Sequence, residues 1–104
     1  MRYKTILGKT VELTIERKLH ILTSHPDMKF HLVKLQQVFT LPDAIRRSRI
    51  DNDVLLFYKY FANIKGGKYI VITVKTGQRN FVLTAYLTDK IRAGELYEEE
   101  KESF

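Results

Sequence analysis

Two groups of residues in this sequence carry side chains suited to acid–base and phosphate chemistry. Thr84 and Tyr86 lie two residues apart in an apolar stretch, and strand periodicity places both side chains on one face of a sheet. Three histidines, His20, His25 and His31, fall within twelve residues near the N-terminus. An imidazole exchanges a proton near neutral pH, and hydroxyl groups hold a phosphate by hydrogen bonds. These residue types suit RNA cleavage, in which the ribose 2′-hydroxyl attacks the adjacent phosphate without a metal ion.

Each group also has a purely structural interpretation. A lone histidine on a helix flank commonly makes only local hydrogen bonds, and threonine and tyrosine are enriched in strands because they pack well there. The spacing of the histidines matches no metal signature, and the sequence contains no cysteine. We therefore predict no metal site and no cofactor.

The sequence has a basic body and an acidic end. Residues 95–104 contain five glutamates and one lysine, a net charge of −4, whereas the seventeen basic and seven acidic residues before them give +10. A basic body favours a polyanionic partner, because each neutralised phosphate releases counterions. We expect one domain over residues 1–94, an acidic tail over residues 95–104, and RNA as the partner, whether transfer RNA, messenger RNA or ribosome-bound RNA.

The N-terminal segment argues against membrane insertion. Residues 1–18 carry charges every few positions and lack the continuous apolar run of a signal peptide or a membrane span. We therefore expect a cytoplasmic protein with no membrane partner.

Two amphipathic helices are predicted before the main strands. Residues 3–13 indicate at most a short edge strand. Thr14 is a suitable N-cap for a helix over residues 15–23, whose apolar stripe consists of Ile15, Leu19 and Leu22. Pro26 disfavours helical geometry at the preceding residue and opens a second helix. The apolar stripe of that second helix consists of Met28, Leu32, Leu35 and Phe39.

Turn residues divide the rest of the chain into strands. The segments 54–61, 69–75 and 80–94 are apolar and are bounded by turns at residues 51–53, 65–68 and 76–78. An arginine-rich segment over residues 44–50 precedes the first of these turns. We predict an α+β domain with two N-terminal helices followed by an antiparallel sheet of about four strands, its helices covering one face.

The other face of this sheet is predicted to be available for a ligand. Strand alternation directs Phe81, Leu83, Ala85 and Leu87 into the core with Ile70, Ile72 and Val74. Thr73 and Lys75 then share the outer face with Thr84 and Tyr86. Lys59 is expected to point outward too, because an inward lysine is costly. The candidate RNA-binding residues are Arg46, Arg47, Arg49, Thr73 and Lys75.

The order of short motifs resembles a known nuclease superfamily. The motifs are HIL-x-SHPD (residues 20–27), LPDAI (41–45), FYKY (57–60), YIVITVK (69–75) and VLTAYLTDKIRAG (82–94). They resemble the phage-associated branch of the superfamily that groups barnase, EndoU, colicin-type and RelE-like (BECR) RNases. The resemblance runs from about residue 14 to residue 94 and implies a metal-independent RNase, possible toxin activity and a neutralising partner such as an acidic antitoxin or immunity protein.

The resemblance also implies roles for individual residues. It assigns His20 as the histidine of the first helix, Lys59 as the basic residue of a strand, and Thr84 with Tyr86 as the late T-x-Y pair. Two alternatives stay open, because His25 competes with His20 and the arginine-rich segment 44–50 competes with Lys59. The function itself has alternatives of other classes, a non-catalytic nucleic-acid-binding module or a partner-binding protein that docks an acidic protein through its basic face.

Overall fold

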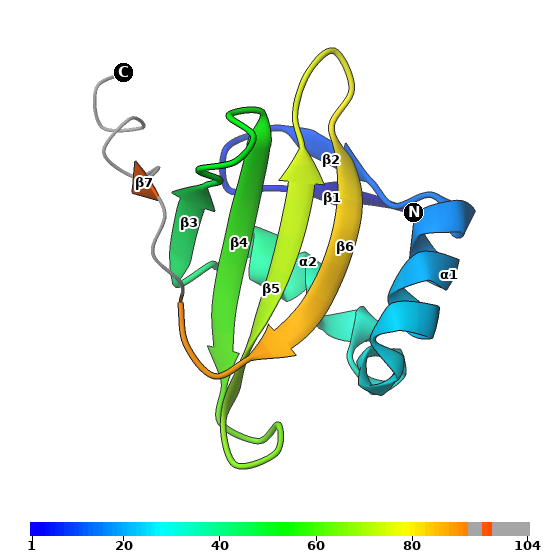
Figure 1. Cartoon of the computed structure of the whole chain (residues 1–104), viewed down its shortest axis with the longest axis vertical. Coiled ribbons are helices and arrows are strands. Elements are labelled where there is room, and N and C mark those ends of the chain that lie inside the picture. The colour runs from blue at the N-terminus through cyan, green and yellow to red at the C-terminus, as the bar shows by residue number, and fades with distance from the viewer. Residues whose placement is uncertain (92–94, 97–104) are drawn as a thin grey trace.

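The strands form one curled sheet. The computed structural model describes residues 1–91 and 95–96, and within these it has seven strands in the order β1-β2-β6-β5-β4-β3-β7 (Figure 1). The strands are β1 (Arg2–Lys4), β2 (Thr10–Glu12), β3 (Ala44–Arg47), β4 (Val54–Phe61), β5 (Lys68–Lys75), β6 (Phe81–Thr88) and β7 (Glu95–Leu96). Neighbours are antiparallel except β2 and β6, which are parallel and pair at Glu12 and Phe81.

The predicted architecture of two N-terminal helices and about four strands is wrong, although the domain is α+β. The chain begins with the β1–β2 hairpin, and β2 then joins the sheet beside β6. Each of these two strands has three residues, of which only Tyr3 and Val11 are buried, so neither gives a clear alternation in the sequence. β7 lies in the predicted acidic tail and pairs with β3, and residues 92–94 and 97–104 lie outside the described residues.

The first predicted helix is confirmed, but its buried face is not the predicted one. In α1 (Ile15–Ser24) the Thr14 hydroxyl accepts a hydrogen bond from the Arg17 amide at 3.1 Å, as expected of an N-cap. Ile15 and Leu19, two residues of the predicted stripe, are 79% and 58% exposed, whereas Ile21 is fully buried. α1 packs beside β6 through the face that carries Arg17 and Ile21, one turn apart.

The second predicted helix is divided into three pieces. These are a 3-10 helix over Pro26–Phe30, another over Leu32–Lys34, and α2 (Leu35–Thr40). Each 3-10 helix closes with a hydrogen bond to the residue three positions back, from His31 to Met28 and from Lys34 to His31. The tighter turns still deliver Met28, Leu35 and Phe39 to the core, where all three are fully buried.

The main core lies between one face of the sheet and the helical segment. α2 lies behind the sheet in Figure 1, and the opposite face is turned to the viewer. The sheet contributes Ile45, Leu55, Phe57, Ile70, Ile72, Val74, Val82 and Ala85 to this core. The outer face carries a smaller apolar cluster in which Ala44, Tyr58 and Val71 are buried and Ile91 packs against them. The outer face, which was predicted to be available for a ligand, is therefore covered by apolar packing in part.

The predicted alternation of β6 fails at a β-bulge. Thr73 pairs with Thr84, but Val74 pairs with Val82, so Leu83 is an extra residue on β6. A bulge shifts the residues before it by one position, which reverses the face to which they point. Val82 is consequently in the core in place of Leu83, whereas Ala85 keeps its predicted inward position.

The turn between β4 and β5 generates the first prediction. Gly67 has a φ of 118°, and a Cβ atom there would overlap the Tyr60 hydroxyl. We expect Gly67→Ala to lower the free energy of unfolding by about 1–3 kcal/mol, the usual cost of a residue held in a disfavoured backbone region. Urea denaturation measures the free energy of unfolding of the wild type and of each variant. Gly77→Ala is the matched control, because Gly77 has an ordinary φ and its Cβ would lie 3.9 Å from the nearest atom considered, the Arg79 carbonyl oxygen. Equal stability of the two variants would contradict the prediction.

Candidate functional site

Thr73 and Thr84 form a cross-strand pair on the outer face. The prediction that they share the outer face on adjacent strands is confirmed, and the β5–β6 register places them directly opposite each other. The Thr73 hydroxyl accepts a hydrogen bond from the Thr84 amide at 3.2 Å and donates to the Thr84 carbonyl oxygen at 3.4 Å. The Thr84 hydroxyl itself is enclosed and has no hydrogen-bond partner among the described residues. Thr84 is thus held by its backbone, and its hydroxyl is an enclosed polar group without a partner among the described residues.

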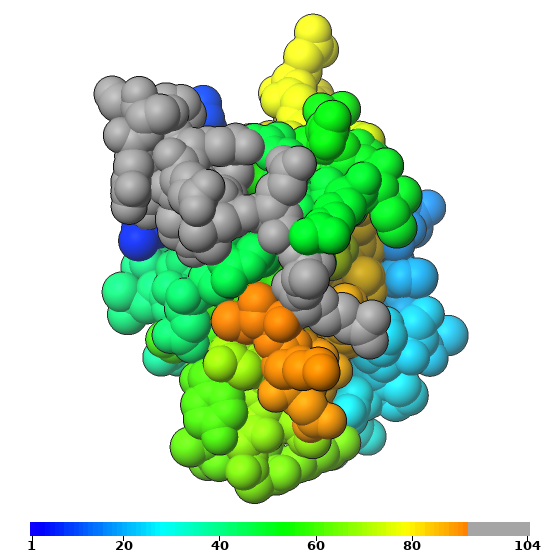
Figure 2. Space-filling view, turned by 60° about the vertical axis from the view of Figure 1, so that its left-hand side comes forward, coloured from blue at the N-terminus to red at the C-terminus, as the bar shows by residue number. Residues whose placement is uncertain are grey.

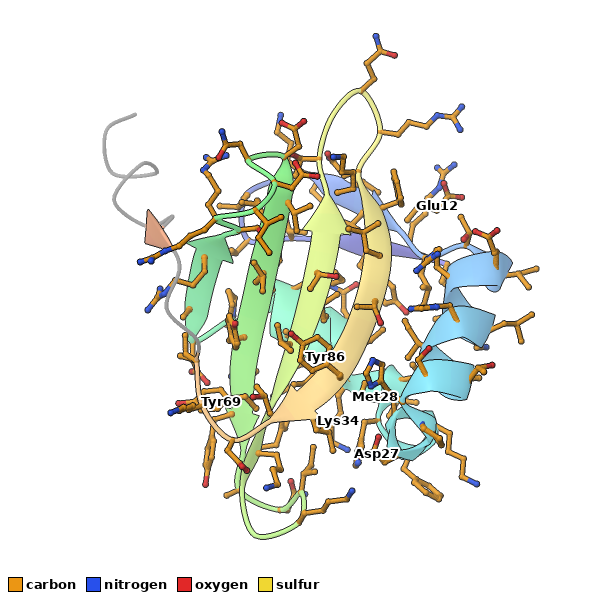
Figure 3. All side chains as sticks on the ribbon, viewed as in Figure 1. Glu12, Asp27, Met28, Lys34, Tyr69 and Tyr86 are labelled. Atoms are coloured by element: carbon orange, nitrogen blue, oxygen red, sulfur yellow. The ribbon has the colours of Figure 1, made fainter. Side chains whose placement is uncertain are left out.

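The end of α1 places His25 against Tyr86. His25 is the C-cap of α1, and its backbone amide donates to the Ile21 carbonyl oxygen at 2.8 Å. Its ring lies 5.3 Å from the Tyr86 ring, between centroids, at an interplanar angle of 30°. Tyr86 points outward on the face seen in Figure 3. The structure therefore brings His25 and Tyr86 together, two residues along β6 from Thr84.

His20 lies elsewhere on α1. Its side chain is half-buried, and no hydrogen bond or ring contact joins it to another described residue. The sequence left the choice between His20 and His25 open. His25 is the one that contacts the predicted Thr84–Tyr86 pair, through Tyr86.

Arg17 is a site residue that the sequence reasoning missed. Its Nε and Nη2 atoms both donate to the carbonyl oxygen of Leu83, at 2.9 and 2.7 Å. Leu83 is the bulged residue that directly precedes Thr84. The signal in the sequence was the spacing of Arg17, Ile21 and His25, which lie four residues apart and so project from one side of a helix.

Lys59 is on the opposite face from the one expected. It pairs with the core residue Ile70, and alternation places it on the same side as Phe57 and Phe61. The side chain remains half-buried at the end of the strand, where its Nζ donates to the Leu41 carbonyl oxygen at 2.9 Å. This location at the end of the sheet removes the desolvation cost on which the outward expectation rested.

The predicted arginine group is divided between the two faces. Arg46 pairs with Leu56 and shares the outer face, whereas Arg47 pairs with Leu55 and shares the core face. Arg47 donates from Nη1 to the Asn52 carbonyl oxygen at 2.7 Å, and Arg49 is exposed beyond the end of β3. Strand alternation thus separates neighbouring arginines that look like one cluster in the sequence.

Lys75 is engaged by two aspartates of the β3–β4 turn. Its Nζ lies 2.6 Å from Asp51 Oδ2 and 4.0 Å from Asp53 Oδ2. The hydrogen bond that Lys75 donates to the Asp51 carboxylate raises the pKa of Lys75, and the same bond lowers the pKa of Asp51. The predicted outward direction of Lys75 is compatible with these contacts, but the ammonium is already paired.

Tyrosine rings extend the site across the outer face. The Tyr60 and Tyr69 rings lie 5.2 Å apart between centroids, and the Tyr58 and Tyr69 rings lie 6.4 Å apart, both in edge-on geometry. Figure 3 shows Tyr69 and Tyr86 on this face of the sheet. An aromatic surface therefore crosses β4, β5 and β6 beside His25.

Two titratable residues of the first 3-10 helix and its C-cap have shifted pKa values. A hydrogen bond from Lys65, at 2.9 Å, lowers the pKa of Asp27. Burial lowers the pKa of His31, whose Nδ1 atom is enclosed and has no hydrogen-bond partner among the described residues. Because the unfolded chain binds this proton more tightly, the His31 contribution to stability falls as the pH drops below the ordinary histidine pKa of about 6.5.

Known proteins do not identify the chain. Comparison with models of protein families, with curated proteins and with solved structures finds no match. Among the residues that the structure describes, no helix has the length and apolar character needed to cross a membrane. Within the same residues, no three histidine or acidic side chains gather closely enough to hold a metal ion.

The contact between Arg17 and the bulge generates the second prediction. We expect Arg17→Met to lower the free energy of unfolding by about 1.5–3 kcal/mol, because the Leu83 carbonyl oxygen loses a charged donor. Amide chemical shifts of Thr84 and Tyr86 should also change. Lys18→Met, in the same helix turn, is the control and should alter stability by no more than about 0.5 kcal/mol. Unchanged β6 shifts in Arg17→Met would show that Arg17 does not position this strand.

Proposed function

We propose that this protein is a metal-independent endoribonuclease whose site lies on the outer face at β6. The observation that carries the proposal is the contact between the His25 and Tyr86 rings, two residues from the unpartnered hydroxyl of Thr84. This contact joins a proton-transferring group, an aromatic ring and a hydrogen-bond donor for phosphate. The basic body of the chain and the ordered motifs that resemble BECR nucleases support the same activity.

In the proposed reaction the ribose 2′-oxygen attacks the adjacent phosphorus atom and the 5′-oxygen of the next nucleotide leaves. The products are a 2′,3′-cyclic phosphate and a 5′-hydroxyl. His25 takes the proton from the 2′-hydroxyl, and a water molecule gives a proton to the leaving oxygen. The Thr84 hydroxyl is enclosed in the free protein, so it donates to a phosphoryl oxygen only after substrate binding uncovers it, and Tyr86 stacks a base.

Arg17 supplies the positive charge that this mechanism needs beside Thr84. Lys59 is no longer proposed for this role, because it lies on the other face of the sheet. Two N–H groups of Arg17 are engaged by Leu83, which fixes the guanidinium next to the strand while its Nη1 remains for a phosphate oxygen. The same basic and aromatic face would be the surface that an acidic antitoxin or immunity protein covers. We propose the cytoplasm as its location, because cellular RNA is present there.

The third prediction concerns cleavage. Purified protein incubated with total RNA in excess EDTA should give discrete fragments with 2′,3′-cyclic phosphate ends. His25→Ala should slow cleavage about 10²–10⁴-fold, the usual contribution of one general acid or base. His31→Ala is the matched control and should keep the wild-type rate, because His31 lies outside the site. Far-UV circular dichroism of each variant checks that the fold is retained.

A non-catalytic single-stranded nucleic-acid-binding module is the second candidate. The edge-on contact between the exposed Tyr60 ring and the Tyr69 ring favours it, because accessible tyrosine rings on a basic sheet suit stacked bases without any acid–base group. The nuclease proposal would be overturned if free RNA stayed intact in EDTA and RNA also stayed intact in a translating extract that retains its Mg²⁺ and ribosomes. Salt-dependent binding that is insensitive to His25→Ala would then favour the binding module.

A further inference from the structure

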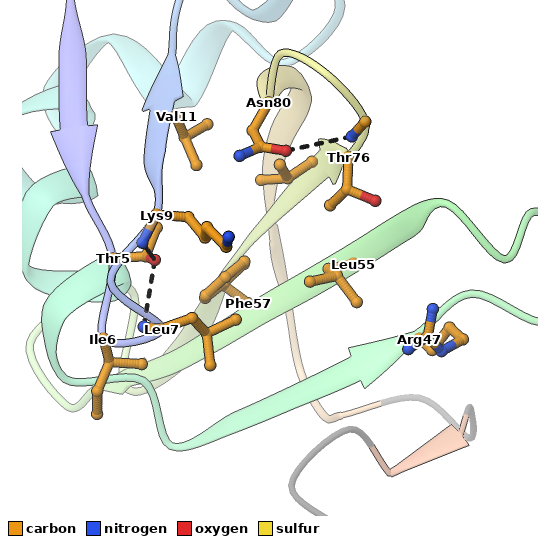
Figure 4. Close-up of a pocket in the computed structure, with 12 residues that line it drawn as sticks. Thr5, Ile6, Leu7, Lys9, Val11, Arg47, Leu55, Phe57, Thr76 and Asn80 are labelled. Atoms are coloured by element: carbon orange, nitrogen blue, oxygen red, sulfur yellow. Dashed lines mark hydrogen bonds between the residues drawn. The ribbon is translucent and has the colours of Figure 1, made fainter. Parts of the chain in front are cut away.

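A separate cavity opens under the β1–β2 turn on the core side of the sheet. Its volume is about 690 Å³, within the range of about 300–1,000 Å³ typical of small-molecule sites (Figure 4). Its apolar lining comes from Ile6, Leu7, Val11, Leu55, Phe57 and Val74. Leu55 and Phe57 lie on the opposite face of β4 from Tyr58, so the cavity is distinct from the proposed nuclease site.

Hydrogen bonds around Thr5 hold the turn that roofs this cavity. The Thr5 hydroxyl accepts from the Leu7 amide at 3.2 Å and from the Lys9 amide at 3.3 Å. The Thr5 amide donates to the Lys9 carbonyl oxygen, and Gly8, with a φ of 78°, completes the turn. Ile6 is further tied to Phe39 of α2 through its backbone amide. The cavity is therefore bounded by a fixed turn rather than by an unsupported loop.

Lys9 gives the cavity its charge. Figure 4 shows its side chain pointing from the turn into the pocket, and no carboxylate of the described residues pairs with its ammonium. None of the described residues that line the cavity is acidic. Arg47, on the opposite rim, already donates to the Asn52 carbonyl oxygen. Lys9 is thus the cation to which a bound anion would be directed.

Asn80 adds a directional polar group at the same rim. Its Oδ1 accepts from the Gly77 amide at 3.2 Å, which fixes the orientation of the amide (Figure 4). Its Nδ2 makes one long contact of 3.4 Å to the Thr10 carbonyl oxygen and retains a second N–H. An ammonium and an amide N–H at the rim of an apolar cavity are suited to the two oxygens of a carboxylate.

We propose that this cavity binds a small amphipathic carboxylate, with its hydrocarbon portion along the half-buried Leu7, above the nearly buried Leu55 and Phe57, and with its carboxylate at Lys9 and Asn80. The apolar walls supply the burial of the tail, and the unpaired ammonium supplies charge complementarity. The proposal does not depend on nuclease activity, because the two sites use opposite faces of the sheet.

Octanoate, kept below its micellar concentration, is the probe. In a methyl-labelled sample of the full chain, titration should give saturable shifts of the Val11, Leu55 and Val74 methyl groups. 1-Octanol, the uncharged ligand of equal chain length, should bind at least about tenfold more weakly, which corresponds to the 1.4 kcal/mol at the low end for a charge-assisted hydrogen bond.

Two lysine variants of the hairpin provide the matched comparison. Lys9→Met removes the charge and keeps an unbranched apolar chain, and it should weaken octanoate binding by about tenfold while leaving 1-octanol binding unchanged. Lys4→Met changes an exposed lysine of β1 that does not line the cavity and should leave both affinities as they are. Absence of saturable shifts, shifts confined to the methyl groups of Val71 on the outer face, or equal octanoate affinity of Lys9→Met and wild type would each overturn the proposal.

Discussion

The outer face of the sheet depends on the β-bulge at Leu83 and on the arginine that binds its carbonyl oxygen. The bulge directs Val82 and Ala85 inward together, which a regular strand could not do because they are three residues apart. β2 pairs with β6 only at Phe81, so the edge of β6 beyond that point needs another donor. Arg17 supplies it, and α1 is thereby held at the edge from which His25 reaches Tyr86.

Strand alternation then gives the sheet two surfaces of different chemistry. Thr73, Thr84 and Tyr86 project outward, where hydroxyls and rings face the end of α1. Leu55 and Val74 project inward, where the β1–β2 hairpin curls over them and leaves the cavity that Lys9 enters. The residues that end β6 and directly follow it, orange in Figure 2, lie at the surface, and Ile91 among them packs against the outer apolar cluster.

Sequence periodicity predicted the features that depend on local patterns and missed those that depend on a distant partner. The N-cap at Thr14, the outward direction of Thr73 and Thr84, and the strands over residues 54–61 and 69–75 follow from local patterns. The bulge was not predictable, because no residue type at Leu83 marks it. Only the pairing of β6 with β5 shows that Leu83 is the extra residue. The helix pattern alone also does not show which face of α1 packs against β6. Ile15 was therefore predicted to be buried, and the contact of Arg17 with Leu83 was missed.

The basic residues of this chain attract a polyanion at long range, but several of them are already paired and contribute little to direct contacts with phosphates. Lys65, Lys68 and Lys75 each pair with an aspartate, so they add to the field of the basic body but offer little to an individual phosphate. Long-range steering depends on net charge and survives such pairing, whereas local affinity needs groups that are not already engaged. In the proposed function those groups are the rings at Tyr86 and His25 and the hydroxyl of Thr84. Stacking and directed hydrogen bonds would therefore set where RNA binds, and the lysines would set how fast it arrives.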